Sequence, residues 1–296
     1  MSFTRVARGV YMIDTAPDVL PRAVASYLVR GEKEAALIDV GYRSTHKQLL
    51  KALDAIAVGP EELRWVVLTH VHLDHCGAVA EVLERYPKAK VLVHRRGQRH
   101  LVSPEKLLDS VRSIFGDEAL RRMGGMKAVA EERVMVAEDE NEVVLSGITF
   151  RPFETPGHAP HHISVLIEPQ RYVVTGDALA SRGPRYPEPI PDTAPPQFSY
   201  EDAVKSVRRI FEHRPRLLLL SHYGPFVSPD DGGEEEIRLL ETRIEKVRVL
   251  KSDGLDPFSI TRRIVDEMEA RSRTNLDLVA RNAVLMAVLG AYLSIP

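Results

Sequence analysis

Apolar residues in the first three-quarters of the chain fall into short blocks bounded by Gly, Pro or charged residues. Blocks rich in β-branched and aliphatic residues predict strands. They span residues 10–13, 25–29, 35–39, 65–69, 91–93, 133–136, 148–153, 162–167, 172–175 and 217–220. Apolar positions three and four residues apart predict helices near residues 49–56, 79–83 and 200–211. Two strand-rich halves of this kind favour a sandwich of two sheets.

The pattern becomes purely helical after about residue 230, with predicted helices at 234–250, 257–270 and 276–293. Residues 102–130 are also typical of amphipathic helix, and we interpret them as an insertion beside the site. The loop 181–198 contains six prolines, which exclude regular helix and stiffen the chain. We therefore predict a catalytic domain at 1–230, with a helical insertion at about 102–130, and a C-terminal helical extension at 231–296.

Composition narrows the class of protein. A chain of 296 residues with 44% hydrophobic residues can bury a sizeable core. A net charge of −2 gives no electrostatic reason to expect nucleic acid as a partner, so we expect a small-molecule substrate. No apolar run is long enough to span a bilayer. The last predicted helix is strongly apolar, which favours packing against the core or against a second copy in a homodimer.

The expected compartment and source rest on a few residue types. The single cysteine, Cys76, excludes an internal disulfide, and the N-terminal residues lack a signal-peptide pattern, so we expect a cytoplasmic protein. Asn and Gln are scarce, and Arg is frequent within mixed charge runs. This bias predicts a thermophilic source, with a GC-rich genome as the alternative explanation.

Candidate chemistry is concentrated directly after the strand predicted at 65–69. His70, His72, Asp74 and His75 lie there within six residues. A strand end that turns into a loop can direct alternate side chains to one point. Neutral imidazole and carboxylate are normal ligands of zinc, so the cluster predicts a metal site rather than a group of solvated loop residues.

The run HVHLDH, preceded by Thr69 and followed by Cys76 and Gly77, resembles the HxHxDH motif of the metallo-β-lactamase-fold superfamily. Four further positions match that family, namely Asp39 in LIDVG, His158 in TPGH, Asp177 in TGDAL and His222 in LSHYG. Each follows an apolar run, and the resemblance covers roughly residues 1–230. It implies an α+β four-layer αββα sandwich, here followed by a C-terminal helical extension.

The resemblance also implies two divalent metal ions, with zinc expected and iron or manganese as alternatives. The implied ligands are His70, His72 and His158 for the first metal, Asp74, His75 and His222 for the second, and Asp177 as a bridge. Asp74 and Asp177 are the implied catalytic carboxylates. Asp39 would orient ligands from outside the set. His162 is expected beside the site or as a packed strand histidine, whereas His161 is interpreted as packed.

The expected activity is that of a dinuclear metal-dependent hydrolase. Two metals can share a hydroxide that attacks a carbonyl or phosphoryl centre, and they stabilise the developing oxyanion. Asp177 resembles the bridging residue of glyoxalase II, lactonase and phosphodiesterase members, because true β-lactamases carry Cys or His there. We therefore predict hydrolysis of an ester, lactone or thioester. Tyr223 is a candidate donor to the oxyanion or the leaving group, and packing alone is its alternative role.

Two other activities remain as alternatives. A phosphodiesterase or nuclease of the same fold would need a basic cleft, which the near-neutral charge disfavours. A mononuclear-iron oxidoreductase similar to the sulfur dioxygenases would hold its iron with two His and one Asp. The complete second-metal set of Asp74, His75 and His222 argues against that activity.

Overall fold

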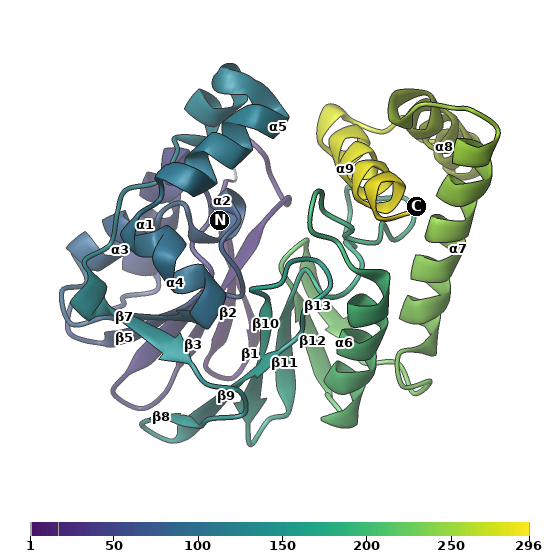
Figure 1. The fold of residues 1–296 in the computed structure, drawn as a ribbon. Helices are drawn as coiled ribbons and strands as arrows, with labels where there is room; N and C mark the ends of the chain where they lie inside the picture. Colours follow the sequence, from purple (N-terminus) through teal and green to yellow (C-terminus); the bar gives the residue numbers. More distant parts are fainter. Residues whose placement is uncertain (1, 17, 296) are drawn as a thin grey trace.

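Two β-sheets packed face to face, with helices on both outer sides, make up the computed structural model (Figure 1). It describes residues 2–16 and 18–295. In chain order the strands are β1 (Phe3–Ala7), β2 (Val10–Asp14), β3 (Ala25–Arg30), β4 (Ala35–Ile38), β5 (Leu63–Val67), β6 (Lys90–His94), β7 (Val134–Ala137), β8 (Val143–Leu145), β9 (Ile148–Glu154), β10 (Ile163–Glu168), β11 (Tyr172–Gly176), β12 (Leu217–Leu220) and β13 (Gly224–Val227). The α-helices are α1 (His46–Ala55), α2 (Leu73–Cys76), α3 (Val79–Arg85), α4 (Arg95–Val102), α5 (Glu105–Met123), α6 (Tyr200–Glu212), α7 (Glu234–Ser252), α8 (Pro257–Ser272) and α9 (Leu278–Ser294).

Both sheets are mixed. The first has the order β1-β2-β3-β4-β5-β6-β7, antiparallel up to β4 and parallel from β4 to β7. The second has the order β13-β12-β11-β10-β9-β8, in which only β11 and β12 are parallel. Parallel strands end at the same edge of a sheet. The parallel pairs β4–β5 and β11–β12 therefore each bring two strand ends together.

Alternation along the buried strands sends side chains to different layers. In β12, Leu219 packs between the two sheets, while Leu218 and Leu220 pack against α6 and α7 on the outside. In β4, Ile38 faces the second sheet, and Leu37 joins the core formed with α1 and α3. Strands buried on both faces explain why the sequence shows continuous apolar runs there. The order of layers is helix, sheet, sheet, helix, as the sequence predicts.

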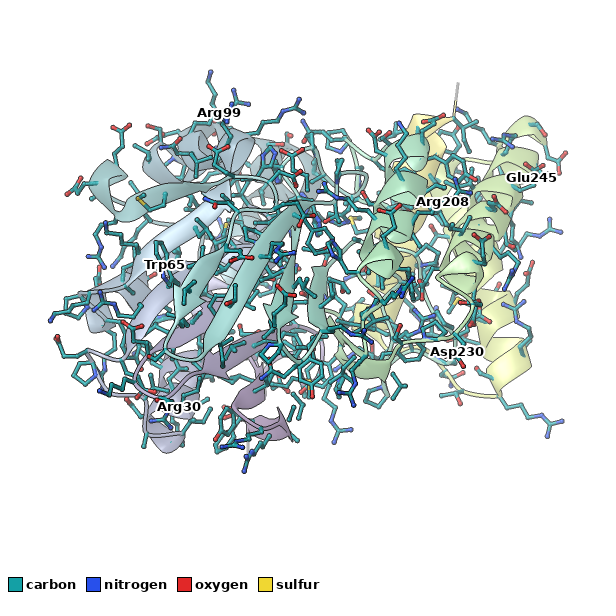
Figure 2. All side chains as sticks on the ribbon, turned by 90° about the horizontal axis from the view of Figure 1, so that it is seen from below. Arg30, Trp65, Arg99, Arg208, Asp230 and Glu245 are labelled. Atoms are coloured by element: carbon teal, nitrogen blue, oxygen red, sulfur yellow. The ribbon has the colours of Figure 1, made fainter. Side chains whose placement is uncertain are left out.

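The C-terminal helices α7, α8 and α9 form a core of their own with the Pro-rich loop 181–198. Ile190 and Phe198 of this loop are buried among their apolar residues. Thr193 Oγ1 donates a hydrogen bond to the carbonyl of Ala287 in α9, and Arg271 of α8 pairs with Glu188 at 2.7 Å. Figure 2 shows the helices carrying Arg208 and Glu245 beside the strand-rich part that carries Arg30 and Trp65. The helical extension thus holds the loop in place.

Some boundaries differ from those expected. The helix expected over 102–130 ends at Met123, because Gly124 and Gly125 both have positive φ, and it is kinked at Gly116. The separate helix α4 precedes it. The short strands β1, β8 and β13 were not predicted, because they are largely half-buried or exposed and lack the continuous apolar runs of equally short interior strands such as β12. Within residues 2–16 and 18–295, we find no helix with the length and apolarity needed to cross a membrane.

Candidate metal centre

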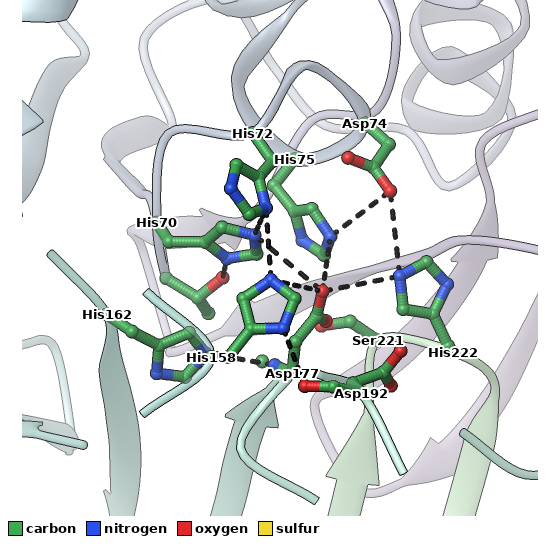
Figure 3. A network of polar contacts seen from close by, with 12 residues as sticks. His70, His72, Asp74, His75, His158, His162, Asp177, Asp192, Ser221 and His222 are labelled. Atoms are coloured by element: carbon green, nitrogen blue, oxygen red, sulfur yellow. Dashed lines mark hydrogen bonds and ion pairs between the residues drawn. The ribbon is translucent and has the colours of Figure 1, made fainter. Parts of the chain in front are cut away.

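The predicted metal ligands meet at the edge where the parallel strands end. Asp39 directly follows β4, and Asp177 directly follows β11. His70 and His72 lie in the turn after β5, and the short helix α2 that begins there carries Asp74 and His75. His222 lies just beyond β12, and His158 occupies the turn between β9 and β10. Each sheet therefore contributes about half of the cluster (Figure 3).

Three histidines form the first group of ligand atoms. His72 Nδ1 lies 3.0 Å from His70 Nε2 and 3.0 Å from His158 Nε2. All three ligand atoms lie within 4.8 Å of one another. Because His70 and His72 come from the first sheet and His158 from the second, this group forms only when the two sheets pack together.

Asp74, His75 and His222 form the second group, with ligand atoms again within 4.8 Å of one another. Asp74 Oδ2 lies 3.5 Å from His75 Nε2 and 3.6 Å from His222 Nε2. The side chain of Asp74 is 21% exposed, whereas that of His75 is fully buried. Asp74 therefore lies on the open side of this group.

A single oxygen of Asp177 lies between the two groups (Figure 3). Asp177 Oδ2 is 3.3 Å from His75 Nε2, 3.4 Å from His158 Nε2, 3.5 Å from His222 Nε2 and 3.7 Å from His70 Nε2. The side chain is only 3% exposed. One carboxylate oxygen is thus shared by imidazoles of both groups.

The outer ring nitrogens of the histidines are held by oxygen atoms. His158 Nδ1 donates to the carbonyl of Asp192 at 3.0 Å, and His222 Nδ1 donates to the carbonyl of Ala23 at 2.7 Å. A carbonyl can only accept, so Nδ1 of each ring carries a proton and Nε2 is the nitrogen that points into the cluster. Such outer contacts fix the tautomer and the direction of a metal-binding imidazole.

The carboxylate of Asp39 orients the ring of His75, as the backbone carbonyls orient His158 and His222. Its Oδ2 accepts from His75 Nδ1 at 2.9 Å and from the hydroxyl of Thr69 at 2.8 Å. Its Oδ1 accepts from the backbone N–H of Thr69 at 2.8 Å, and the hydroxyl of Ser221 lies 3.3 Å from Oδ2. Asp39 therefore links the strand ends of both sheets while lying outside the ligand set.

His162 lies beneath Asp177. Its Nε2 accepts from the backbone N–H of Asp177 at 2.9 Å, so its Nδ1 carries the proton and donates to the hydroxyl of Thr155 at 2.9 Å. Gly176 makes this approach possible, because a Cβ there would lie 2.3 Å from His162 Nε2. His162 precedes β10 and supports the backbone of Asp177 without facing the ligand atoms.

The surroundings of the histidines differ between the two groups, and so do the shifts of their pKa values. Burial, followed by the positive charges of neighbouring histidines, lowers the pKa of His70 well below its usual value, and that of His72 to about 3. Burial also acts against a proton on His222, but the carboxylates of Asp177, Asp192 and Asp74 outweigh it and raise its pKa to about 10. Buried carboxylates thus accumulate negative charge around the second group.

The donor set fits divalent metal ions. His75 Nε2 and Asp177 Oδ1 are buried, and no described residue offers either atom a well-formed hydrogen bond. The ring nitrogens of His70 and His158 both lie 3.0 Å from His72 Nδ1. Burying such unpaired acceptor atoms side by side is energetically unfavourable unless a cation binds them. Imidazole and carboxylate are ligands that zinc and related divalent ions accept. The residues present can therefore hold one ion in each group, with Asp177 between them.

Tyr223 is not brought to the cluster. Its ring packs between the sheets with the residues of the inner core. Burial, followed by the negative charge of Asp14, raises the pKa of its phenol to about 12, and none of the metal-binding residues contributes to this shift. The structure thus places Tyr223 among packing residues, although its neighbour His222 enters the second group.

Sequence reasoning missed Asp192 in the Pro-rich loop. Its carbonyl orients His158, and its carboxylate accepts from the hydroxyl of Ser181 at 2.7 Å. Burial, and then the negative charge of Asp177, raises the pKa of Asp192 to about 7. A backbone carbonyl contact leaves no mark on residue type, and an isolated Asp among prolines carries no motif, so no sequence signal could have identified it.

Known proteins share both the sequence pattern and the fold. The profile described as "Metallo-beta-lactamase superfamily" matches residues 19–222. A "metallo-beta-lactamase fold-containing protein" of Sulfurisphaera tokodaii is 33% identical over 225 residues, which cover 75% of this chain and 80% of that protein. The hydroxyacylglutathione hydrolase GloC of Haemophilus influenzae is 26% identical over 204 residues, covering 67% and 83%. The crystal structure of a metallo-beta-lactamase family protein from Thermus thermophilus superimposes with a TM-score of 0.71 at 20% identity, covering 97% of this chain and 93% of that one.

Proposed function

Because the chain belongs to the metallo-beta-lactamase superfamily, we propose that it is a metal-dependent hydrolase that binds two divalent ions, most simply zinc. The observation that carries this proposal is the position of Asp177 Oδ2, which lies within 3.7 Å of imidazole nitrogens from both ligand groups. A carboxylate oxygen shared in this way is the arrangement required to bridge two ions. A single ion would be bound by His70, His72 and His158 alone. It would leave Asp74, His75 and His222 without an ion to hold.

The two groups of ligand residues would each bind one ion. His70, His72 and His158 would hold one ion, and Asp74, His75 and His222 the other. When bound, the ions would lower the pKa of a shared water and polarise the substrate carbonyl. Asp74 borders the open side of the site, where its partly exposed carboxylate can help orient the substrate, whereas the side chain of Asp177 is buried between the two ligand groups.

We infer that the substrate is an ester, lactone or thioester. The likeness to a protein named hydroxyacylglutathione hydrolase supports this class, and Asp at the bridging position argues against a true β-lactamase. No second activity is favoured by a feature of the described residues. The nearly balanced charge of the chain gives no support to a nucleic-acid substrate.

Metal analysis combined with hydrolysis assays tests the proposal. We expect two zinc-like ions per chain and turnover of generic esters or thioesters. Asp177→Ala should abolish turnover and leave the far-ultraviolet circular dichroism unchanged. Asp139→Asn is the matched control, because Asp139 is a half-exposed partner of Arg209 outside the ligand groups. One tightly held iron, with oxygen consumption on a persulfide, would overturn the assignment.

A further inference from the structure

Residues 178–182 form a short segment that connects two of the metal-binding residues. The segment directly follows the shared ligand Asp177, which itself follows β11. At its other end the backbone N–H of Arg182 donates to the carbonyl of His222 at 2.7 Å. The position of this segment therefore affects the bridging carboxylate through the chain and a second-group histidine through a hydrogen bond.

Glu236, in the first turn of α7, holds this segment in place. Its Oε2 accepts from the backbone N–H of Ala180 at 3.1 Å, and its Oε1 pairs with Arg182 Nη1 at 2.5 Å. The same Nη1 donates to the carbonyl of Ala180 at 3.4 Å. One carboxylate of the C-terminal extension thus contacts both the backbone and a side chain of the segment, although Ala180 lies 56 residues earlier in the chain.

These contacts are shielded from water, and packing alone does not fix the segment. The side chains of Arg182 and Glu236 are 12% and 5% exposed, and the guanidinium lies 4.7 Å from the centre of the Phe226 ring. A cavity of about 20 Å³ is bordered by Glu236 and residues 177–180. Because side chains leave this space beside the segment unfilled, its polar contacts decide its position, and such contacts are stronger where water is excluded.

We propose that Glu236 is a positioning residue for the second metal group. By fixing Arg182 it fixes the backbone of His222, whose ring is held by the carbonyl of Ala23 at 2.7 Å. The first group is reached less directly, because Ser181 contacts the carboxylate of Asp192 and the carbonyl of the latter orients a first-group histidine. The inference rests on the proposed function, because it assumes that two ions bind.

Zinc titration in competition with a chromophoric chelator measures one Kd for each ion, and His222→Ala identifies the binding step that belongs to the second group. Glu236→Gln keeps the size of the side chain, but its single oxygen can accept from Ala180 or from Arg182, not from both. We expect the Kd of the second ion to rise about tenfold and that of the first ion to stay within about threefold of the wild type. Turnover should fall at limiting zinc and recover at excess zinc.

A double variant separates positioning from stability. Arg182→Met together with Glu236→Met leaves no member of the pair as a buried charge without its partner, so stability to urea should recover relative to Glu236→Ala. The Kd of the second ion should stay raised, because the N–H of Ala180 still lacks the carboxylate. Glu235→Gln, at the exposed neighbouring residue, is the matched control and should bind both ions as the wild type does.

Thermal unfolding of every variant shows whether its fold is intact, and the double variant decides the matter if Glu236→Gln does not fold. The inference would be overturned by an unchanged second Kd in Glu236→Gln, by an equal rise for both ions, or by a wild-type second Kd in the double variant. The same rise in Glu235→Gln would also overturn it. Two ions bound by the wild type without turnover of any ester or thioester would count against the proposed hydrolase alone, whereas a single bound ion would overturn both.

Discussion

Asp39 Oδ2 accepts a hydrogen bond from His75 Nδ1 at 2.9 Å, although 36 residues separate them. The bond joins the end of β4 to helix α2. It fixes the proton on the outer nitrogen of His75, so that the lone pair of Nε2 faces Asp74 and Asp177. Asp39 is itself held in the left-handed region, with φ at +57°. The orientation of a central ligand thus depends on a carboxylate that touches no ligand atom.

Replacement of Asp39 should weaken the second metal site without emptying the first. Asp39→Asn keeps the size of the side chain and tolerates positive φ, but it removes the charge that favours the Nδ1 proton. We expect metal affinity to fall about 10- to 100-fold, as measured by competition with a chromophoric chelator. Asp54→Asn, at an exposed carboxylate paired with Arg85, is the control. An affinity within about twofold of the wild type would contradict the role given to Asp39.

Gly176→Ala should destabilise the fold through His162. The new Cβ would lie 2.3 Å from His162 Nε2, and φ is already +55°. Left-handed strain together with overpacking predicts a loss of about 2–5 kcal/mol in urea unfolding. Gly147→Ala separates the two causes, because Gly147 has φ of +84° with nothing within 4 Å, and strain alone should cost about 1–2 kcal/mol. Equal losses in both variants would show that the contact with His162 is unimportant.

The buried ion pair of Arg182 and Glu236 should matter more than exposed pairs. Their atoms are 2.5 Å apart, and the side chains are 12% and 5% exposed. Glu236→Ala leaves a buried guanidinium without its partner, which predicts a loss of about 3–5 kcal/mol. The exposed pair of Arg248 and Glu245 in α7 provides the comparison, and Glu245→Ala should cost less than about 1 kcal/mol. Chemical unfolding measures the free energy of unfolding of both variants. Similar losses of stability in Glu236→Ala and Glu245→Ala would show that burial of the ion pair does not matter.

Gly290 of α9 should influence the metal site from a distance. A Cβ at this position would lie 1.7 Å from the carbonyl oxygen of Thr193, next to Asp192, whose own carbonyl orients His158. Gly290→Ala therefore should reduce metal affinity at the first site, even though alanine is the better helix former by about 1 kcal/mol. Chelator competition measures the effect. Asn282→Ala on the exposed side of the same helix should leave affinity unchanged, and an equal effect there would exclude a path through Thr193.

Removal of metal should lower thermal stability. Ions that bind only the folded chain stabilise it by about 2.7 kcal/mol when present at roughly a hundredfold excess over Kd. For a chain of this size we expect a chelator to lower Tm by about 5–10 °C in differential scanning calorimetry. Asp177→Ala should show a much smaller response, because it lacks the shared oxygen. A chelator effect of the same size in that variant would place the stabilising ion elsewhere.

Part of this protein could be predicted without coordinates. The positions of the interior strands were clear because strands buried on both faces give continuous apolar runs. Short peripheral strands such as β1 (Phe3–Ala7) and β13 (Gly224–Val227) were missed, because they are half-exposed and carry little pattern. The sequence pattern placed the end of the helix too late, because apolar residues continue beyond Gly124 and Gly125. In the structure α5 ends at Met123, because both glycines have positive φ.

The sequence by itself determined which residues are candidates for the metal site. Six ligand positions and one shared carboxylate follow apolar strands in recognisable motifs. Only the tertiary structure decided how they are held. The carbonyl of Ala23 orients His222 across 199 positions, and the carbonyl of Asp192 orients His158 from a loop fixed by α9. It also brought His161 against His70 and His72. Backbone carbonyls are the same in every residue, and contacts between two sheets depend on packing. Neither leaves a local signal in the order of amino acids.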